Sequence, residues 1–180
     1  MAMKKREIIG NYDTTARLYD EQYREEQSLK ISFTLKRVIP RMGDTVIDAG
    51  CGTGMLFEHL HNYGLLVGVD PSINMLKEAK KRTRKGGNIE LVLGDVEALP
   101  FRSDSSDVVY CISVLQLMDD PRKGLEEILK VLKSKGSFAV TLLRKARFAQ
   151  DLNKFVRGVV VELYDSESMK DVFLIGQRIE

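Results

Sequence analysis

Two aspartates in the sequence stand where apolar stretches end, and the first directly precedes a glycine-rich turn. Asp48 closes the run Thr45–Ile47 and leads into Gly50–Gly54, which is followed by the helix-compatible stretch Met55–Phe57. A strand that breaks into glycines and re-enters as a helix points free backbone N–H groups at a ligand, and glycine lets that ligand come close. Asp70 ends the next apolar run about 20 residues later, the offset at which a carboxylate accepts hydrogen bonds from a ribose. The spacing predicts a site for a nucleoside-bearing cofactor.

A regular alternation of strands and helices must position these residues. The alternation predicts a parallel sheet with helices on both faces, and the unbroken apolar runs are typical of strands buried on both sides. Two last apolar runs have no helix between them and predict an antiparallel hairpin. The fold class is therefore α/β, a doubly wound seven-stranded sheet, mostly parallel, with an antiparallel last strand. Strands are expected near 45–48, 65–69, 89–93, 107–113, 136–143, 159–164 and 172–176, and helices near 54–62, 72–85, 122–132 and 146–156.

The segment before the first strand has a different character. Residues 1–12 are expected to form a loose basic tail, and two helical segments follow at about 13–27 and 29–39. Pro40 ends the second helix because proline cannot continue one. No internal repeat, low-complexity tract or linker divides the chain, so its 180 residues are expected to fold as one domain with a sizeable core.

Residues after the third and fourth strands extend the pattern of polar strand ends. Asp95 follows the third expected strand and Ser113 follows the fourth. Ligands of open parallel sheets bind at the carboxyl ends of the strands. The alternative for Asp70 or Asp95 alone is that it caps the helix that follows, which aspartate does well. Three carboxylates at three successive strand ends are costly to gather without polar partners, so the set with Asp48 favours a binding site.

The composition indicates which partners, metals and cellular location can be expected for the chain. The net charge of +2 gives no global basic field, so nucleic acid is a possible partner that the charge does not indicate. No apolar run approaches the roughly 20 residues that span a bilayer, and the first residues lack the apolar core of a signal peptide, so no membrane is expected. Cys51 and Cys111 are too few for a disulfide framework or a zinc-ligand set, so no metal is expected. These features favour a reduced cytoplasmic location.

Several segments resemble the motif series of class I S-adenosylmethionine-dependent methyltransferases. They are Val46–Gly54, Gly68–Ser72, Gly94–Val96 and Leu99–Phe101, with Ile128–Ser137 resembling the helix, turn and strand that lead into that family's fifth strand. The resemblance covers essentially the whole chain. It implies a Rossmann-like sheet of order 3-2-1-4-5-7-6 and S-adenosyl-L-methionine as the cofactor. It also divides the single domain into an N-terminal helical lid (1–40) and a cofactor-binding core (41–180).

The resemblance assigns roles to residues that match the motifs. Asp48 would orient the ammonium group of the cofactor, and Asp70 would accept hydrogen bonds from both ribose hydroxyls. Met75 would lie against the adenine face, where a polarizable thioether suits an aromatic ring. Asp95 would accept a hydrogen bond from the adenine amino group, and the Val96 N–H would donate to the ring.

The remaining cofactor contacts implied by the resemblance lie around the methionine part. The turn Gly50, Cys51 and Gly52 would pack against that part, and the backbone of Ser113 would lie near it. Pro71 and Tyr19 complete the predicted cofactor site. Tyr12 and Gln116 are predicted to contact the methyl acceptor.

Tyr12 and Tyr19 belong to a stretch that resembles the lid of many small-molecule and tRNA-modifying members. Either tyrosine could close over a sulfonium, because a cation favours an aromatic face. The alternative is that the tyrosines merely dock a terminal helix on the sheet. The fuller pattern resembles a group of short archaeal methyltransferases, some relatives of which work with a small zinc-binding activator subunit; that partner is an expectation by analogy.

Methyl transfer from a sulfonium needs positioning and exclusion of water more than side-chain chemistry, which agrees with the lack of a Ser/His/Asp or Cys/His arrangement. His59 and His61 are expected on the helix after the glycine turn, away from the strand ends, and both cysteines as small buried fillers. The acceptor stays open between a small molecule and a tRNA or translation component. Two rival functions remain: a non-catalytic cofactor-binding scaffold and a nicotinamide-dependent oxidoreductase. The second lacks a plausible proton donor.

Overall fold

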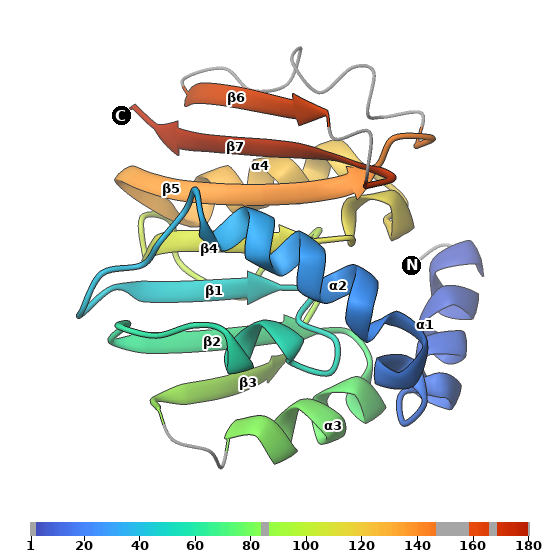
Figure 1. Cartoon of the computed structure of the whole chain (residues 1–180). Helices are drawn as coiled ribbons and strands as arrows, with labels where there is room; N and C mark the ends of the chain where they lie inside the picture. Colours follow the sequence, from blue (N-terminus) through green and yellow to red (C-terminus); the bar gives the residue numbers. More distant parts are fainter. Residues whose placement is uncertain (1–2, 84–86, 147–158, 166–168, 180) are drawn as a thin grey trace.

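The computed structural model describes residues 3–83, 87–146, 159–165 and 169–179. Its strands form one seven-stranded sheet of order β3-β2-β1-β4-β5-β7-β6, which confirms the predicted order (Figure 1). Only β7 runs against its neighbours, because β5 and β6 each pair with it in antiparallel fashion and the other pairings are parallel. The strands are β1 (Thr45–Ala49), β2 (Leu65–Asp70), β3 (Ile89–Leu93), β4 (Ser106–Ile112), β5 (Leu132–Leu143), β6 (Val159–Asp165) and β7 (Asp171–Arg178).

Helices cover both faces of this sheet, as predicted. The helices α2 (Tyr19–Leu35) and α3 (Ile73–Thr83) and the 3-10 helix η1 (Met55–Glu58) pack on one face, and α4 (Pro121–Val131) packs on the other. Alternate residues of β1 serve the two cores, since Val46 faces α2 and Ile47 faces α4. A 3-10 helix, η2 (Leu115–Leu117), follows β4. The helix expected at 146–156 lies outside the described residues.

The segment after the glycine turn differs from the expected helix at 54–62. The structure forms only η1 there, and His59 and His61 are exposed residues beyond it, not on a helix. The backbone bonds of this segment close over three residues, from the Phe57 N–H to the Gly54 carbonyl and from the His59 N–H to the Leu56 carbonyl. Asn62 has a φ angle of 62°, in the left-handed region, so a right-handed helix cannot continue to residue 62.

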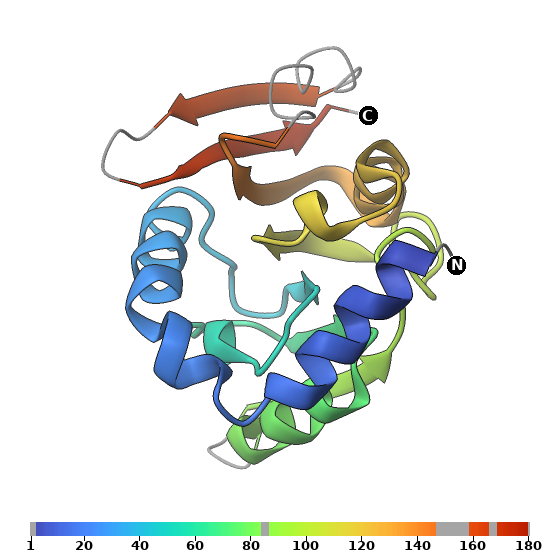
Figure 2. The ribbon, with the colours of Figure 1, turned by 90° about the vertical axis from the view of Figure 1, so that its right-hand side faces the viewer.

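The N-terminal segment also differs from its prediction. Residues 1–12 were expected to be a loose tail, but a helix, α1, spans Met3–Thr15. The helices expected at 13–27 and 29–39 are replaced by the end of α1 and the single helix α2, with a break at 16–18. Figure 2 shows α1, in dark blue, crossing in front of the edge at which the parallel strands end. The carboxyl edge of the sheet therefore has a helix lying over it.

Candidate functional site

The glycine turn is shaped by backbone conformations that favour glycine. The φ angles of Gly50, Gly52 and Gly54 are 83°, 53° and 76°. The N–H groups of Gly50 and Cys51 both donate to the carbonyl of Val69, at 2.8 and 2.9 Å, so β2 holds the turn in place. A Cβ at Gly52 would meet no atom within 4 Å, because this residue opens into a cleft. The turn thus presents bare backbone to the space above the sheet.

Asp48 and Asp70 lie buried on either side of this turn. Burial, with the nearby charge of Asp70, raises the pKa of Asp48 to about 8. Among the described residues, none donates a hydrogen bond to the Asp48 carboxyl group. Asp70 accepts from the Gly52 N–H at 2.9 Å and from the Ser72 N–H at 2.8 Å. Burial raises the pKa of Asp70 to about 6, although those two N–H groups act in the opposite direction. The site therefore holds two desolvated acids and no matching cation at Asp48.

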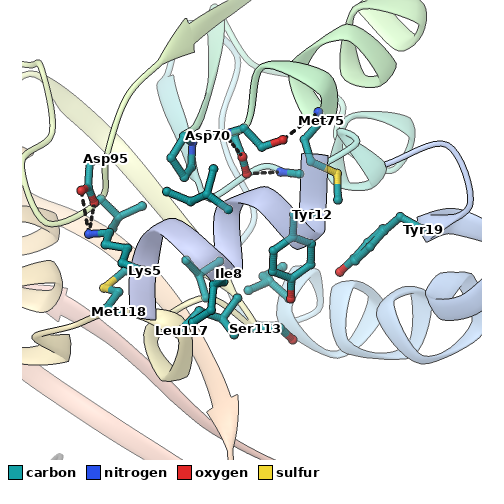
Figure 3. A pocket seen from close by; sticks show the side chains of 18 residues that line it. Lys5, Ile8, Tyr12, Tyr19, Asp70, Met75, Asp95, Ser113, Leu117 and Met118 are labelled. Carbon is teal, nitrogen blue, oxygen red and sulfur yellow. Dashed lines mark hydrogen bonds and ion pairs between the residues drawn. The ribbon is translucent and has the colours of Figure 1, made fainter. Parts of the chain in front are cut away.

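Asp95 has a partner that the sequence did not suggest. The Nζ atom of Lys5, on α1, lies 2.6 and 2.8 Å from the two carboxylate oxygens of Asp95 and also contacts Glu97. Figure 3 shows Lys5 reaching from α1 to Asp95 at the edge of the pocket. Burial lowers the pKa of the Lys5 ammonium, but the two carboxylates outweigh it and raise that pKa overall. In this structure Lys5 therefore contacts the carboxylate predicted to receive the adenine amino group.

Tyr12 and Tyr19 come from α1 and α2 and meet at the cleft. Their ring centroids are 6.0 Å apart, and Tyr23 stacks on Tyr19 at 4.9 Å. Burial raises the pKa of both the Tyr12 and the Tyr19 hydroxyl, so neither supplies a base at neutral pH. Figure 3 shows the two rings near Met75. The predicted lid action of these residues is not tested by the structure alone.

A cleft with about 700 Å³ of empty space, part of it open to solvent, gathers most of the predicted site. The predicted residues that line it are Tyr12, Tyr19, Gly50, Gly52, Asp70, Pro71, Met75, Asp95, Val96 and Ser113. An adjoining hollow is lined by Asp48 and Cys51 and shares Tyr19, Gly50 and Gly52 with the cleft.

Gln116 lines neither space. Its Nε2 atom donates to the carbonyl of Ser113 at 2.8 Å, and its Oε1 atom is buried with no described partner. The structure does not bring Gln116 to the wall of the cleft, and its contact with the acceptor stays a prediction.

Sequence reasoning missed part of the cleft wall. Lys5, Ile8 and Ile9 come from α1, where the polar sequence gave no helical signal. Ile112, Val114, Leu117 and Met118 come from the end of β4 and from η2 and its flanks, where the apolar run could have pointed to them. The apolar residues form a wall opposite the buried acids.

Other kinds of site find no support among the described residues. No group of three or more His, Cys, Asp or Glu side chains there could hold a metal ion. Cys51 and Cys111 are both buried and unbonded, and burial raises the pKa of each thiol, so neither is an activated nucleophile. None of the described helices is both long and apolar enough to cross a membrane.

Comparison with known proteins gives a consistent result. The family model described as "Methyltransferase domain" matches residues 47–140, more than half of the chain. The uncharacterized protein MJ1252 of Methanocaldococcus jannaschii is 29% identical over 93% of this chain and 69% of its own length. A demethylmenaquinone methyltransferase of Clavibacter sepedonicus is 33% identical over 74% of this chain and 54% of its own length. The chain thus spans only part of these longer relatives.

A solved structure shares the whole fold. It is a Haloferax volcanii methyltransferase in complex with the Trm112 methyltransferase activator, with a TM-score of 0.77 and 21% identity over 94% of this chain and 98% of that one. At this identity the likeness concerns the fold, which includes the N-terminal helices as well as the sheet.

Proposed function

The chain belongs to the methyltransferase domain family and is a class I S-adenosylmethionine-dependent methyltransferase, and we propose that it methylates a small molecule or a tRNA or translation component in the cytoplasm. The observation that carries the proposal is the pair of buried acids, Asp48 and Asp70, beside the open glycine turn. Two desolvated carboxyl groups favour a cationic ligand, because a nearby positive charge stabilises their ionised forms.

The two buried carboxyl groups favour S-adenosylmethionine over a nicotinamide dinucleotide as the cofactor. A dinucleotide would bring an anionic pyrophosphate to the glycine turn, and a helix N-terminus normally receives it. Here the turn leads only into the four-residue η1, and Asp48 lies buried beneath it. S-adenosylmethionine instead carries an ammonium and a sulfonium, which suit a negative site.

Individual roles in the proposed cofactor site follow from the wall of the cleft. Asp70 keeps a free lone pair on each oxygen after accepting from Gly52 and Ser72, so it has room for the two ribose hydroxyls. Met75, which is almost fully buried, supplies a thioether face for the adenine. Asp48 would pair with the ammonium. Gly52 leaves space for the methionine part because it has no Cβ.

At the adenine end, Asp95 would accept from the amino group only when Lys5 gives up one contact. Glu97 offers Lys5 a second carboxylate, so the ammonium keeps a partner during this exchange. When bound, the cofactor supplies a methyl group on a sulfonium, already a strong electrophile. The protein's part is then to orient the acceptor and exclude water, which the apolar wall and the two tyrosines can do.

Calorimetry with S-adenosylmethionine and with NAD tests the cofactor. We expect saturable binding of the first and none of the second, and the reverse would replace the proposal with an oxidoreductase. Transfer of a radiolabelled methyl group to separate tRNA, ribosomal-protein and metabolite pools then tests catalysis. Binding of S-adenosylmethionine without transfer of the methyl group to any of these pools would favour a non-catalytic cofactor-binding scaffold.

A small zinc-binding activator subunit is part of the proposal as a partner. The Haloferax volcanii neighbour forms a complex with the Trm112 methyltransferase activator, and β3 stands at the edge of the sheet with Leu93 59% exposed. An edge strand presents main-chain groups with which a second chain can pair. Co-purification from the native organism, with mass and zinc analysis, checks for the subunit. Leu93→Lys should prevent its co-elution, and an unaffected complex would place the contact elsewhere.

A further inference from the structure

Ser113, at the carboxyl end of β4, lies in the cleft wall with a backbone conformation that non-glycine residues rarely adopt. Its φ angle is 61°, in the left-handed region. Such strained residues persist only where the surroundings hold them, and they concentrate at ligand sites.

Four neighbours fix this residue. The Ser113 N–H donates to the hydroxyl and the carbonyl of Thr141 on β5, at 2.9 and 3.2 Å. The Ser113 carbonyl accepts from Gln116 at 2.8 Å. Its hydroxyl oxygen accepts from the Nζ atom of Lys30, on α2, at 3.0 Å and, at the longer distance of 3.5 Å, from Gln27 one turn earlier on the same helix. The backbone is thus held by β5 and η2, and the side chain is held by α2, most closely by Lys30.

Lys30 is 1% exposed, which is unusual for a lysine. Three oxygen atoms surround its ammonium: those of Glu26 and Ser113 accept hydrogen bonds, and the Asp171 carboxylate pairs with it by charge alone. Glu26 Oε1, one turn earlier on α2, is 2.6 Å away, and Asp171 Oδ2, on a fully buried residue at the start of β7, is 2.8 Å away. Ser113 supplies the third oxygen. The ammonium therefore joins α2, β7 and the end of β4 at one buried point.

A need to anchor α2 does not by itself explain this arrangement. Apolar side chains of similar volume anchor helices without the desolvation cost of a buried ion pair. An ion pair between Lys30 and Asp171 could anchor α2 without any bond from Lys30 to Ser113, which among the described residues of the cleft wall is the non-glycine residue with a positive φ angle. The directional bond to Ser113 is what an apolar anchor could not provide.

We propose that Lys30 is a positioning residue, which fixes Ser113 and through it the methionine part of the bound cofactor. This proposal rests on the proposed function, because it assumes that S-adenosylmethionine binds with its methionine part beside Ser113. Glu26 and Asp171 act by holding Lys30 in place. The adenosine part, which the other strand ends surround, does not depend on Lys30.

The test uses two ligands that differ in the amino-acid part. The double variant Lys30→Met/Asp171→Leu removes both buried charges together, which avoids leaving one of them unpaired. Calorimetry is expected to show about tenfold weaker binding of S-adenosylmethionine and unchanged binding of 5′-methylthioadenosine, since coupled neighbours commonly lose this much. The exposed Lys36→Met serves as the matched control and should change neither constant. Equal weakening of both ligands, or of neither, would overturn the proposal.

Ser113→Ala shows whether Lys30 acts through Ser113, and it keeps the Lys30–Asp171 pair. Alone, it should weaken S-adenosylmethionine binding about as much as the double variant does. Added to the double variant, it should cause no further loss, because the contact is already absent. A full additional loss would refute action through Ser113. A wild-type chain that binds neither ligand would instead refute the proposed function, so the two failures differ.

Discussion

Binding of S-adenosylmethionine should release a proton at neutral pH, because Asp48 holds one in the unliganded protein. Burial, together with the charge of Asp70, raises the pKa of Asp48 to about 8. At pH 7 about nine tenths of the molecules then carry this proton. A cationic ammonium beside Asp48 favours the ionised carboxylate and lowers its pKa below neutrality. Binding should therefore expel up to about 0.9 proton per site at pH 7.

The sign of the pH dependence follows from the same values. Only the ionised form of Asp48 pairs with the ammonium, so affinity should rise with pH up to the pKa of the free protein. Below pH 8, each lower pH unit should weaken binding by up to about tenfold, and above pH 8 the ionisation of Asp48 should add no further affinity. Asp70, whose pKa is raised to about 6, should add a second loss in more acidic solution.

Titration calorimetry at pH 7 in buffers of different ionisation enthalpy measures the released protons directly. The observed heat should change linearly with buffer enthalpy, with a slope of about 0.5–0.9 proton. Asp48→Asn, which keeps the shape but cannot titrate, should remove this slope and weaken binding. A flat line for the wild-type protein, or the same slope for Asp48→Asn, would refute the assignment of the proton to Asp48.

Four other predictions, each for a single variant, concern stability and the glycine turn. Without ligand, Asp48→Asn should have a melting temperature several degrees above that of the wild type. The difference should widen as the pH rises from about 4 to 8, because the wild-type protein must keep Asp48 protonated in the folded state and so loses unfolding free energy over that range. A difference in melting temperature that does not depend on pH would contradict this. Gly52→Ala should fold yet fail to bind S-adenosylmethionine in calorimetry, because the added methyl group would enter the cleft. Gly50→Ala should instead lose about 1–3 kcal/mol of unfolding free energy, because the φ angle of Gly50 is 83° and a Cβ there would clash with a Val114 methyl group. Normal binding by Gly52→Ala would move the cofactor away from the turn. Tyr110→Phe should lower the unfolding free energy measured by urea denaturation by about 1 kcal/mol, since the buried Tyr110 hydroxyl donates at 2.7 Å to the carbonyl of Val38. An unchanged urea concentration at the midpoint of unfolding would show that this hydrogen bond has no net effect on stability.

The sheet could be predicted from the sequence because its signal is local. Each strand is a short apolar run, and the chain connections leave few topologies open. The helix expected at 54–62 was wrong, because the chain forms only a 3-10 turn there and Asn62 takes a left-handed conformation. The apolar run Met55–Phe57 does not distinguish a 3-10 turn from a helix.

The site could be predicted only as far as the motifs reach. The aspartates and glycines sit at strand ends, so their convergence follows from the parallel topology. Lys5 was missed because α1 has no apolar stripe, and its helix is stabilised by contacts with distant segments. Lys30 was missed for a related reason, since its three oxygen partners come from two positions far away in sequence and one nearby. Such pairings depend on the folded arrangement.

The N-terminal segment is fastened to the site almost entirely by polar contacts. At one end of α1, Lys5 contacts Asp95 and Glu97. At the other end, the Asp13 carboxylate accepts hydrogen bonds from the Ser72 hydroxyl and, at 3.0 Å, from the Asn74 N–H.

The start of α2 is also attached by polar contacts. Asp20 accepts a hydrogen bond from the Thr53 hydroxyl at 2.7 Å and pairs with Arg82, beside the glycine turn. Together these contacts join the N-terminal segment to the segments that follow β1, β2 and β3. Lys5 is the one side chain of α1 that is fully buried among those described, while Ile8, Ile9 and Tyr12 are half-buried. The side chains of Lys5 and Glu97 are each only 9% exposed, so separating α1 from the sheet would leave buried charges without partners, which is costly. α1 is therefore held firmly over the cleft, and the lid action expected of the N-terminal segment stays a prediction.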